Sequence, residues 1–109
     1  MYDRDDATNG RDQTAVDADR RILEAMEEAH DFPGYYPVVV IARSSDGFEA
    51  DLQATLAAEQ GGAPFRIRER SSREGNYVSY RVELFVATPE AALARKLTLA
   101  SLSGVLLLL

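Results

Sequence analysis

The sequence contains no cysteine and no tryptophan, and its only histidine is His30. Without cysteine the chain has no disulfide bond, no thiolate nucleophile and no cysteine-ligated metal. A single histidine does not supply a multi-histidine metal centre within one chain. We therefore expect neither a metal nor a cofactor, and no catalytic residues are identified.

Long hydrophobic runs are also missing. The longest mostly apolar stretch, residues 97–109, is interrupted by threonine, serine and glycine and is shorter than the roughly 20 residues of a membrane-spanning helix. The first residues, M-Y-D-R-D-D, lack the basic and apolar regions of a secretory signal. A cytoplasmic protein with no membrane contact is expected. Its length of 109 residues suits one modest hydrophobic core.

The net charge of −6 is unevenly distributed along the chain. Residues 1–31 contain ten acidic residues and four arginines, whereas residues 32–109 contain eight charges of each sign. The acidity thus belongs to an N-terminal extension, residues 1–30, and a neutral domain follows over residues 31–109. Residues 1–11 are polar and aperiodic, and we expect them to be disordered. A helix with a narrow apolar stripe is then expected from about Asp12 to His30.

The stretch from Phe65 to Val86 has the strongest pattern in the chain. Two runs that alternate with period two flank a polar turn containing Gly75 and Asn76, a pattern typical of an antiparallel hairpin. In the second run one phase is apolar and is expected to face the core. The residues of this phase are Val78, Tyr80, Val82, Leu84 and Val86.

The hairpin is flanked by segments that predict two helices and two more strands. Val38–Ala42 is β-branched and apolar, and is predicted to be a central strand buried on both faces. Asp46 and Glu49 have the spacing of a capping box, and Gly61 with Gly62 ends the helix that follows. Thr88 and Pro89 begin a second helix, with Arg95 and Lys96 facing outward. The side chains expected to pack against the sheet are Phe48, Leu52, Leu56, Leu93 and Leu97.

The predicted order is therefore an N-terminal helix followed by strand, helix, strand, strand, helix and strand. Such a chain forms the α+β, ferredoxin-like split β-α-β sandwich, whose antiparallel sheet has the strand order 4-1-3-2 and both helices on one face. The predicted strands are Tyr36–Arg43, Phe65–Ser71, Asn76–Ala87 and Val105–Leu109.

Four short motifs carry a resemblance to a known family. They are Phe32-Pro33, Tyr36-Pro37, R-x-S-S-x-x-G-N-Y over residues 70–77, and the ending G-V-L-L-L-L. Residues 31–109 resemble the YbeD-like family, a bacterial family of unknown function. The resemblance implies a ferredoxin-like fold similar to that of ACT regulatory domains. It carries no established catalytic residues.

Arginines concentrate in and around the hairpin, and these residues are a candidate site for an anion or a partner. Arg66, Arg68 and Arg70 alternate on one strand, Arg73 lies in the turn, and Arg81 lies on the partner strand. The patch is suited to phosphate, carboxylate or RNA backbone. Alternatively, charge along an edge strand only prevents sheet-to-sheet aggregation.

Tyr77 follows the turn in a context that is similar to part of the RNP1 motif of RNA-recognition domains. That motif needs two aromatic side chains on the open face of the sheet, and here Gly75 occupies one of the two positions. A structural role for Tyr77 in the hairpin is the alternative.

The segment Ser44, Ser45, Asp46 and Gly47 is a candidate small-ligand loop. It lies between the first strand and the helix after it, where ACT-like domains bind amino acids, and a helix N-terminus binds a carboxylate. The same residues are also typical of an ordinary helix start.

We interpret the protein as a non-enzymatic regulatory or adaptor domain that binds a protein partner or a small metabolite. The rival hypothesis is a nucleic-acid-binding module that uses the open sheet face and the arginines. The first and fourth strands are apolar in both phases, so half of the open face is expected to be a continuous apolar surface. We expect the N-terminal helix to cover that half, in its own chain or in a second copy, and the protein to be a homodimer.

Overall fold

The structure is a computed structural model that describes the backbone of residues 2–109 and the side chains from Val16 onward. It divides into two compact units, residues 1–31 and 32–109. The hairpin and all four strands lie in the second unit. Nearly all of the segment that resembles the YbeD-like family lies there too. No described helix is long and apolar enough to cross a membrane.

The first unit is a single helix, α1 (Tyr2–Ala29). It begins at Tyr2 and not near Asp12, so residues 2–11 are helical where disorder was expected. Residues 2–11 contain no proline, so their backbone can continue the helix toward the N-terminus.

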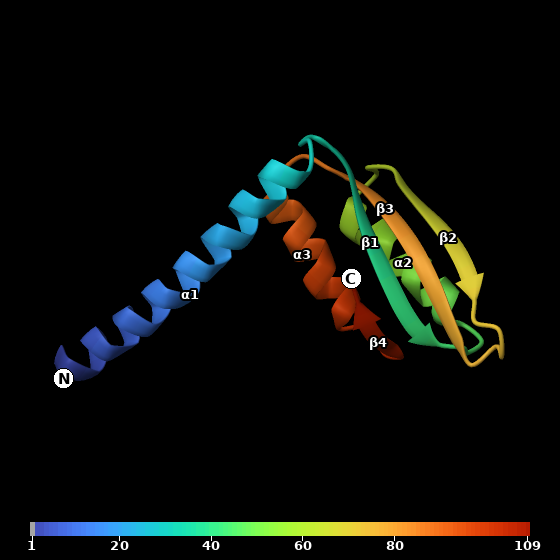
Figure 1. Ribbon diagram of the computed structural model, residues 1–109, viewed down its shortest axis with the longest axis horizontal. Helices are drawn as coiled ribbons and strands as arrows, with labels where there is room; N and C mark the ends of the chain where they lie inside the picture. The colour runs from blue at the N-terminus through green and yellow to red at the C-terminus, as the bar shows by residue number, and fades with distance from the viewer. Residues whose placement is uncertain (1) are drawn as a thin grey trace. The chain divides into compact units, whose positions relative to one another are not determined.

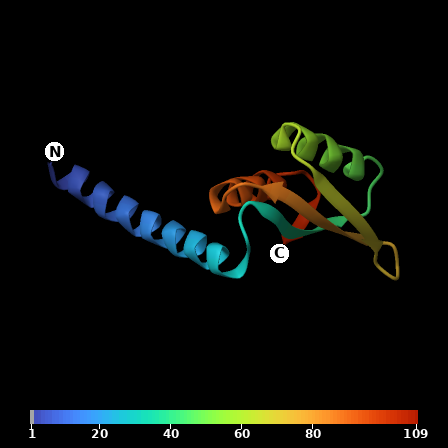
Figure 2. The ribbon, with the colours of Figure 1, turned by 90° about the horizontal axis from the view of Figure 1, so that it is seen from above.

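The second unit has the predicted ferredoxin-like architecture, with one sheet and two helices (Figure 1). The strand order is β2-β3-β1-β4, which is the predicted order 4-1-3-2 read from the other edge, and every neighbouring pair is antiparallel. Helices α2 and α3 lie on the same face of the sheet (Figure 2). The elements are β1 (Gly34–Arg43), α2 (Phe48–Gln60), β2 (Phe65–Ser71), β3 (Tyr77–Val86), α3 (Pro89–Ala100) and β4 (Val105–Leu108).

The core lies between this sheet and the two helices. Alternation along β1 and β3 puts every second side chain on the helix side, and the predicted apolar phase of β3 is buried throughout. On α2, Phe48, Leu52 and Leu56 are buried as predicted. Val38, Val40 and Ala42 are fully buried, but Val39 and Ile41 are only half-buried. The prediction that β1 is buried on both faces is therefore wrong, since neither α2 nor α3 covers its second face.

Helix α3 shows a second difference from the prediction. Its buried positions are Pro89, Ala92 and Leu99, whereas Leu93 is half-buried and Leu97 is 67% exposed. This spacing turns Arg95 partly inward, where its Nε donates to Oε1 of buried Gln60 at 3.0 Å. The prediction that Arg95 faces outward is therefore wrong, since its guanidinium group contacts α2.

The N-cap of α3 is the predicted residue, but the N-cap of α2 is not. Thr88 is the N-cap of α3, its hydroxyl accepts from the Ala91 N–H at 3.1 Å, and Pro89 follows it, as predicted. The predicted capping box of α2 is absent. Its N-cap is Gly47, in the left-handed conformation, and no side chain caps the helix. Because the helix begins at Phe48, Asp46 lies one residue too early to act as the cap.

Candidate functional site

The face of the sheet turned away from α2 and α3, here called the open face, is built from rows of side chains that cross all four strands. Residues directly opposite each other in an antiparallel pair project to the same face. Arg68 is opposite Arg81, Arg81 is opposite Val39, and Val39 exchanges both backbone hydrogen bonds with Leu109. Each row thus changes from arginine on β2 to a leucine in β4 or directly after it. The next row contains Arg70, Ser79, Ile41 and Leu107.

Three arginines form one end of these rows, and we call Arg68, Arg70 and Arg81 the arginine cluster. All three are exposed, and with Val39, Ser79 and Glu69 they line a cavity of about 410 Å³. The ion pairs formed among residues 16–109 are Arg20 with Asp17 and Arg95 with Glu59. None of the three arginines in the cluster has a carboxylate partner among these residues.

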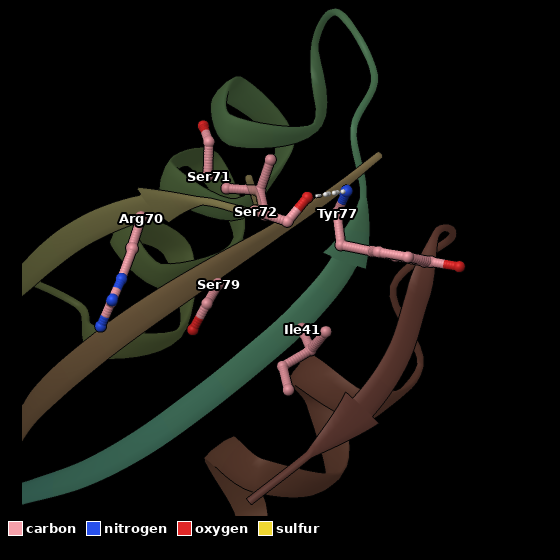
Figure 3. Close-up of a pocket in the computed structure, with 7 residues that line it drawn as sticks. Ile41, Arg70, Ser71, Ser72, Tyr77 and Ser79 are labelled. Atoms are coloured by element: carbon pink, nitrogen blue, oxygen red, sulfur yellow. Dashed lines mark hydrogen bonds between the residues drawn. The ribbon is translucent and has the colours of Figure 1, made fainter. Parts of the chain in front are cut away.

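A second, smaller cavity of about 200 Å³ continues from the first and shares Arg70 and Ser79 with it. Figure 3 shows that Arg70, Ser79 and Ile41 project to the same side of the sheet. Ser79 has a small side chain between two large neighbours in its row, which makes the middle of the open face concave.

The other residues of the predicted arginine patch lie around the cluster. Arg66 shares the open face, and its guanidinium lies 4.2 Å from the centre of the Tyr35 ring, a cation–π contact. Arg73 belongs to the turn after β2 and does not line either cavity of the open face. The structure therefore brings Arg66, Arg68, Arg70 and Arg81 together on one face.

Tyr77 begins β3, and its position is fixed by the turn. Its N–H donates to Oγ of Ser72 at 3.1 Å (Figure 3), and its carbonyl accepts from the Ser72 N–H at 2.8 Å. The side chain is 45% exposed, and it lines the smaller cavity at the end of the open face. Gly75, with φ of 76°, supplies the left-handed turn residue.

Four apolar residues form the other end of the rows, and we call Val39, Ile41, Leu107 and Leu109 the apolar half. Leu107 is 50% exposed and Leu109 61% exposed, while the two β1 residues are half-buried. A register shift between Ile41 and Ala42 makes Leu106 an extra residue in β4. The predicted continuous apolar surface on this half of the open face is confirmed in its arrangement.

Sequence reasoning missed Tyr35 and Phe85, two aromatic residues of the open face. They are paired across β1 and β3, and their rings meet edge to face at 5.5 Å. Phe85 is in phase with Arg81 and Glu83, so the alternation of β3 contained the signal. Tyr35 lies outside the predicted first strand, which begins at Tyr36, yet β1 begins at Gly34.

The candidate ligand loop lies on the other side of the sheet, at the start of α2. Ser44, Ser45, Asp46 and Gly47 line a cavity of about 470 Å³. Its lining also includes Glu49 of α2, Glu69 of β2 and Tyr80 of β3. Burial raises the pKa of the Tyr80 phenol, and the negative charges of Glu69 and Glu49 raise it further. With three carboxylates around it, this cavity opposes the binding of another carboxylate.

No cluster of three or more metal-ligating side chains occurs among the described residues. The open face offers the positive charge of its arginines, the carboxylate of Glu83, hydroxyl groups, aromatic rings and apolar surface as its means of recognition.

The sheet order and the two helices on one face define a ferredoxin-like α+β protein with a mixed, arginine-and-apolar open face. The family described as protein of unknown function (DUF493) matches residues 27–109, and the chain belongs to this family. The match confirms the resemblance to the YbeD-like family that the sequence motifs indicated.

Two solution structures of the Helicobacter pylori protein HP0495, one of them described as a hypothetical protein, are similar to this chain. The first has a TM-score of 0.63 at 20% identity, and covers 73% of this chain and 85% of the other. The second has a TM-score of 0.54 at 16% identity, and covers 72% of this chain and 87% of the other. At this identity the similarity supports the fold alone. No curated protein matches the chain.

Proposed function

We propose that this protein is a non-enzymatic adaptor or regulatory domain that binds a protein partner through its open face. The observation that carries the proposal is the junction of an arginine cluster with an exposed apolar half on the sheet face turned away from α2 and α3. Protein interfaces combine these two elements, since apolar side chains supply burial and arginine supplies directional hydrogen bonds.

A small metabolite is the weaker candidate ligand. The cavity where ACT-like domains bind amino acids is lined here by Asp46, Glu49 and Glu69, which oppose the carboxylate of an amino acid.

A nucleic acid is also less favoured. The second unit has no excess of positive charge, since residues 32–109 contain eight charges of each sign. Stacking of bases needs aromatic rings in the middle of the central strands of the open face. The middle of β1 and β3 presents Val39, Ile41, Ser79 and Arg81 instead, and the aromatic residues of this face, Tyr35, Tyr77 and Phe85, lie at the ends of these strands.

Site-directed photo-crosslinking tests the proposal. A photoreactive residue at Leu107 of the open face is compared in cells with one at Leu97, an exposed leucine on α3. We expect protein adducts from position 107 and few or none from position 97. Adducts of similar yield from both positions, or adducts with nucleic acid, would contradict the proposed function.

A further inference from the structure

The open face specifies the chemistry of its partner more narrowly than the proposed function does. Arg68 and Arg81 lie directly opposite each other across β2 and β3, and like charges in this position destabilise a sheet. Arg70 adds a third positive charge to the same cavity, and Glu69 adds one negative charge, so the three arginines still outnumber the carboxylates. A bound anion would remove the repulsion, because a carboxylate accepts hydrogen bonds from more than one guanidinium group.

The apolar half limits which anion fits. Val39 is next to Arg81 in its row, Ile41 is separated from Arg70 by Ser79, and Leu109 and Leu107 lie beyond them. A free phosphate or a nucleic-acid backbone would leave these four side chains in contact with water. A polypeptide with carboxylates beside aliphatic side chains satisfies both ends of each row.

The arrangement also distinguishes between a helix and an extended segment. Every second side chain of an extended segment lies in a single line on one side, so an extended segment that runs along the strands would meet either the arginine cluster or the apolar half, and not both. A helix presents neighbouring stripes of side chains to one surface. Its diameter, about 10–12 Å, is comparable to the width from β2 to β4, about 14 Å at ~4.8 Å per strand.

We propose, on the basis of the proposed function, that the open face binds an acidic amphipathic helix of a partner protein. The helix lies along the strands, with its acidic stripe on the arginine cluster and its apolar stripe on the apolar half. Ser79 leaves room between these two stripes for the closest approach of the partner backbone.

The experiment uses the full chain, labelled with ¹⁵N, and three synthetic helical peptides of equal length. One peptide carries a leucine stripe beside a glutamate stripe, the second has glutamine in place of each glutamate, and the third has the first composition in scrambled order. We expect the first peptide to shift open-face amide signals and the other two to bind at least tenfold more weakly. Equal binding of all three peptides would overturn the proposal.

Matched variants of the protein locate the contact. Arg68→Gln with Arg81→Gln should weaken binding of the first peptide at least tenfold, and Leu107→Ser should weaken it severalfold. Arg73→Gln with Lys96→Gln changes the net charge equally but lies outside the open face, and should leave the affinity within twofold. An equal loss in both double variants would mean that only net charge matters, and would overturn the proposal.

Other occupants of the open face give different results. Tighter binding of a single-stranded RNA, with steep salt dependence, would overturn the proposal. So would a dimer that dissociates in Leu107→Ser and binds no peptide, because a second copy would then occupy this face. If crosslinking from position 107 captures a partner while no acidic peptide binds, this inference fails and the proposed function stands.

Discussion

Gln60 connects three elements of the second unit through one buried amide. Its Nε2 donates to the carbonyls of Phe85, at 2.9 Å, and Pro64, at 3.2 Å, while its Oε1 accepts from Arg95. Arg95 also forms an ion pair with Glu59 at 3.5 Å. The end of α2 is thus tied both to the end of β3 and to α3.

Replacing Gln60 with Leu should lower the free energy of unfolding by about 1–3 kcal/mol, because a buried donor and acceptor lose their partners. Urea unfolding measures this change. Gln53→Leu is the matched control, since Gln53 is exposed on the same helix, and it should change stability by less than about 0.5 kcal/mol. Similar values for both variants would show that the amide network does not stabilise the fold.

Tyr80 makes stability depend on pH in the alkaline range. Its pKa is raised in the folded protein above the ordinary value of 10.0, so the unfolded chain releases the phenolic proton first as the pH rises. Unfolding is then favoured above pH 10. Tyr80→Phe should therefore flatten the fall in unfolding free energy between pH 9 and pH 11. Tyr77→Phe, at an exposed tyrosine, is the control, and an identical slope in wild type and Tyr80→Phe would contradict the prediction.

At the scale of the elements, the buried faces of the helices can be tested with two leucines. Leu52 on α2 is fully buried and Leu97 on α3 is 67% exposed. Leu52→Ala should lower the unfolding free energy by about 2–5 kcal/mol, as for other buried large-to-small changes. Leu97→Ala should cost less than about 0.5 kcal/mol. Equal costs in chemical denaturation would mean that the helix faces are assigned incorrectly.

The elements themselves could be predicted from sequence because period-two alternation and turn residues are local signals. β2 has the predicted bounds Phe65–Ser71, and β3 differs by one residue at each end. The orientation of α3 could not be predicted in the same way. Leu93 and Leu97 predicted one buried side of α3. Arg95 of α3 instead donates a hydrogen bond to Gln60 of α2, a residue more than 30 positions earlier in the chain. Only the tertiary structure brings these two residues together.

The candidate site also combines features that local sequence signals predict with features that depend on the tertiary structure. Alternation placed Arg66, Arg68 and Arg70 on one side of a strand, and the topology placed Arg81 beside them. The sequence did not reveal the exact opposition of Arg68 and Arg81, because the register of a hairpin depends on its turn. It also did not reveal the cavity at Ser79, which depends on the sizes of neighbours on three different strands.

At the scale of the whole molecule, charge and apolar surface are divided between the two units. The first unit, residues 1–31, contains ten acidic residues, whereas the second unit has no net charge. The first unit is helical, and Val16 and Ile22 on α1 are about half exposed. The second unit presents the apolar half and the arginine cluster. An acidic helix with apolar side chains is thus part of the same chain as a face suited to such a helix.

The expectation that the N-terminal helix covers the apolar half, in its own chain or in a second copy, stays a prediction. Deleting residues 1–30 should increase the exposure of the apolar half to water, lower solubility and increase the fluorescence of a dye that binds apolar surface. If the helix is exchanged between two copies, the mass in solution should fall from dimer to monomer, or rise through aggregation.

Deletion should also tighten binding of the leucine-and-glutamate peptide, since a competing helix is removed. Leu107→Ser in the truncated chain is the control and should reverse the gain in dye binding. A truncated protein that stays soluble, binds no dye and keeps its oligomeric state would show that residues 1–30 do not cover this surface.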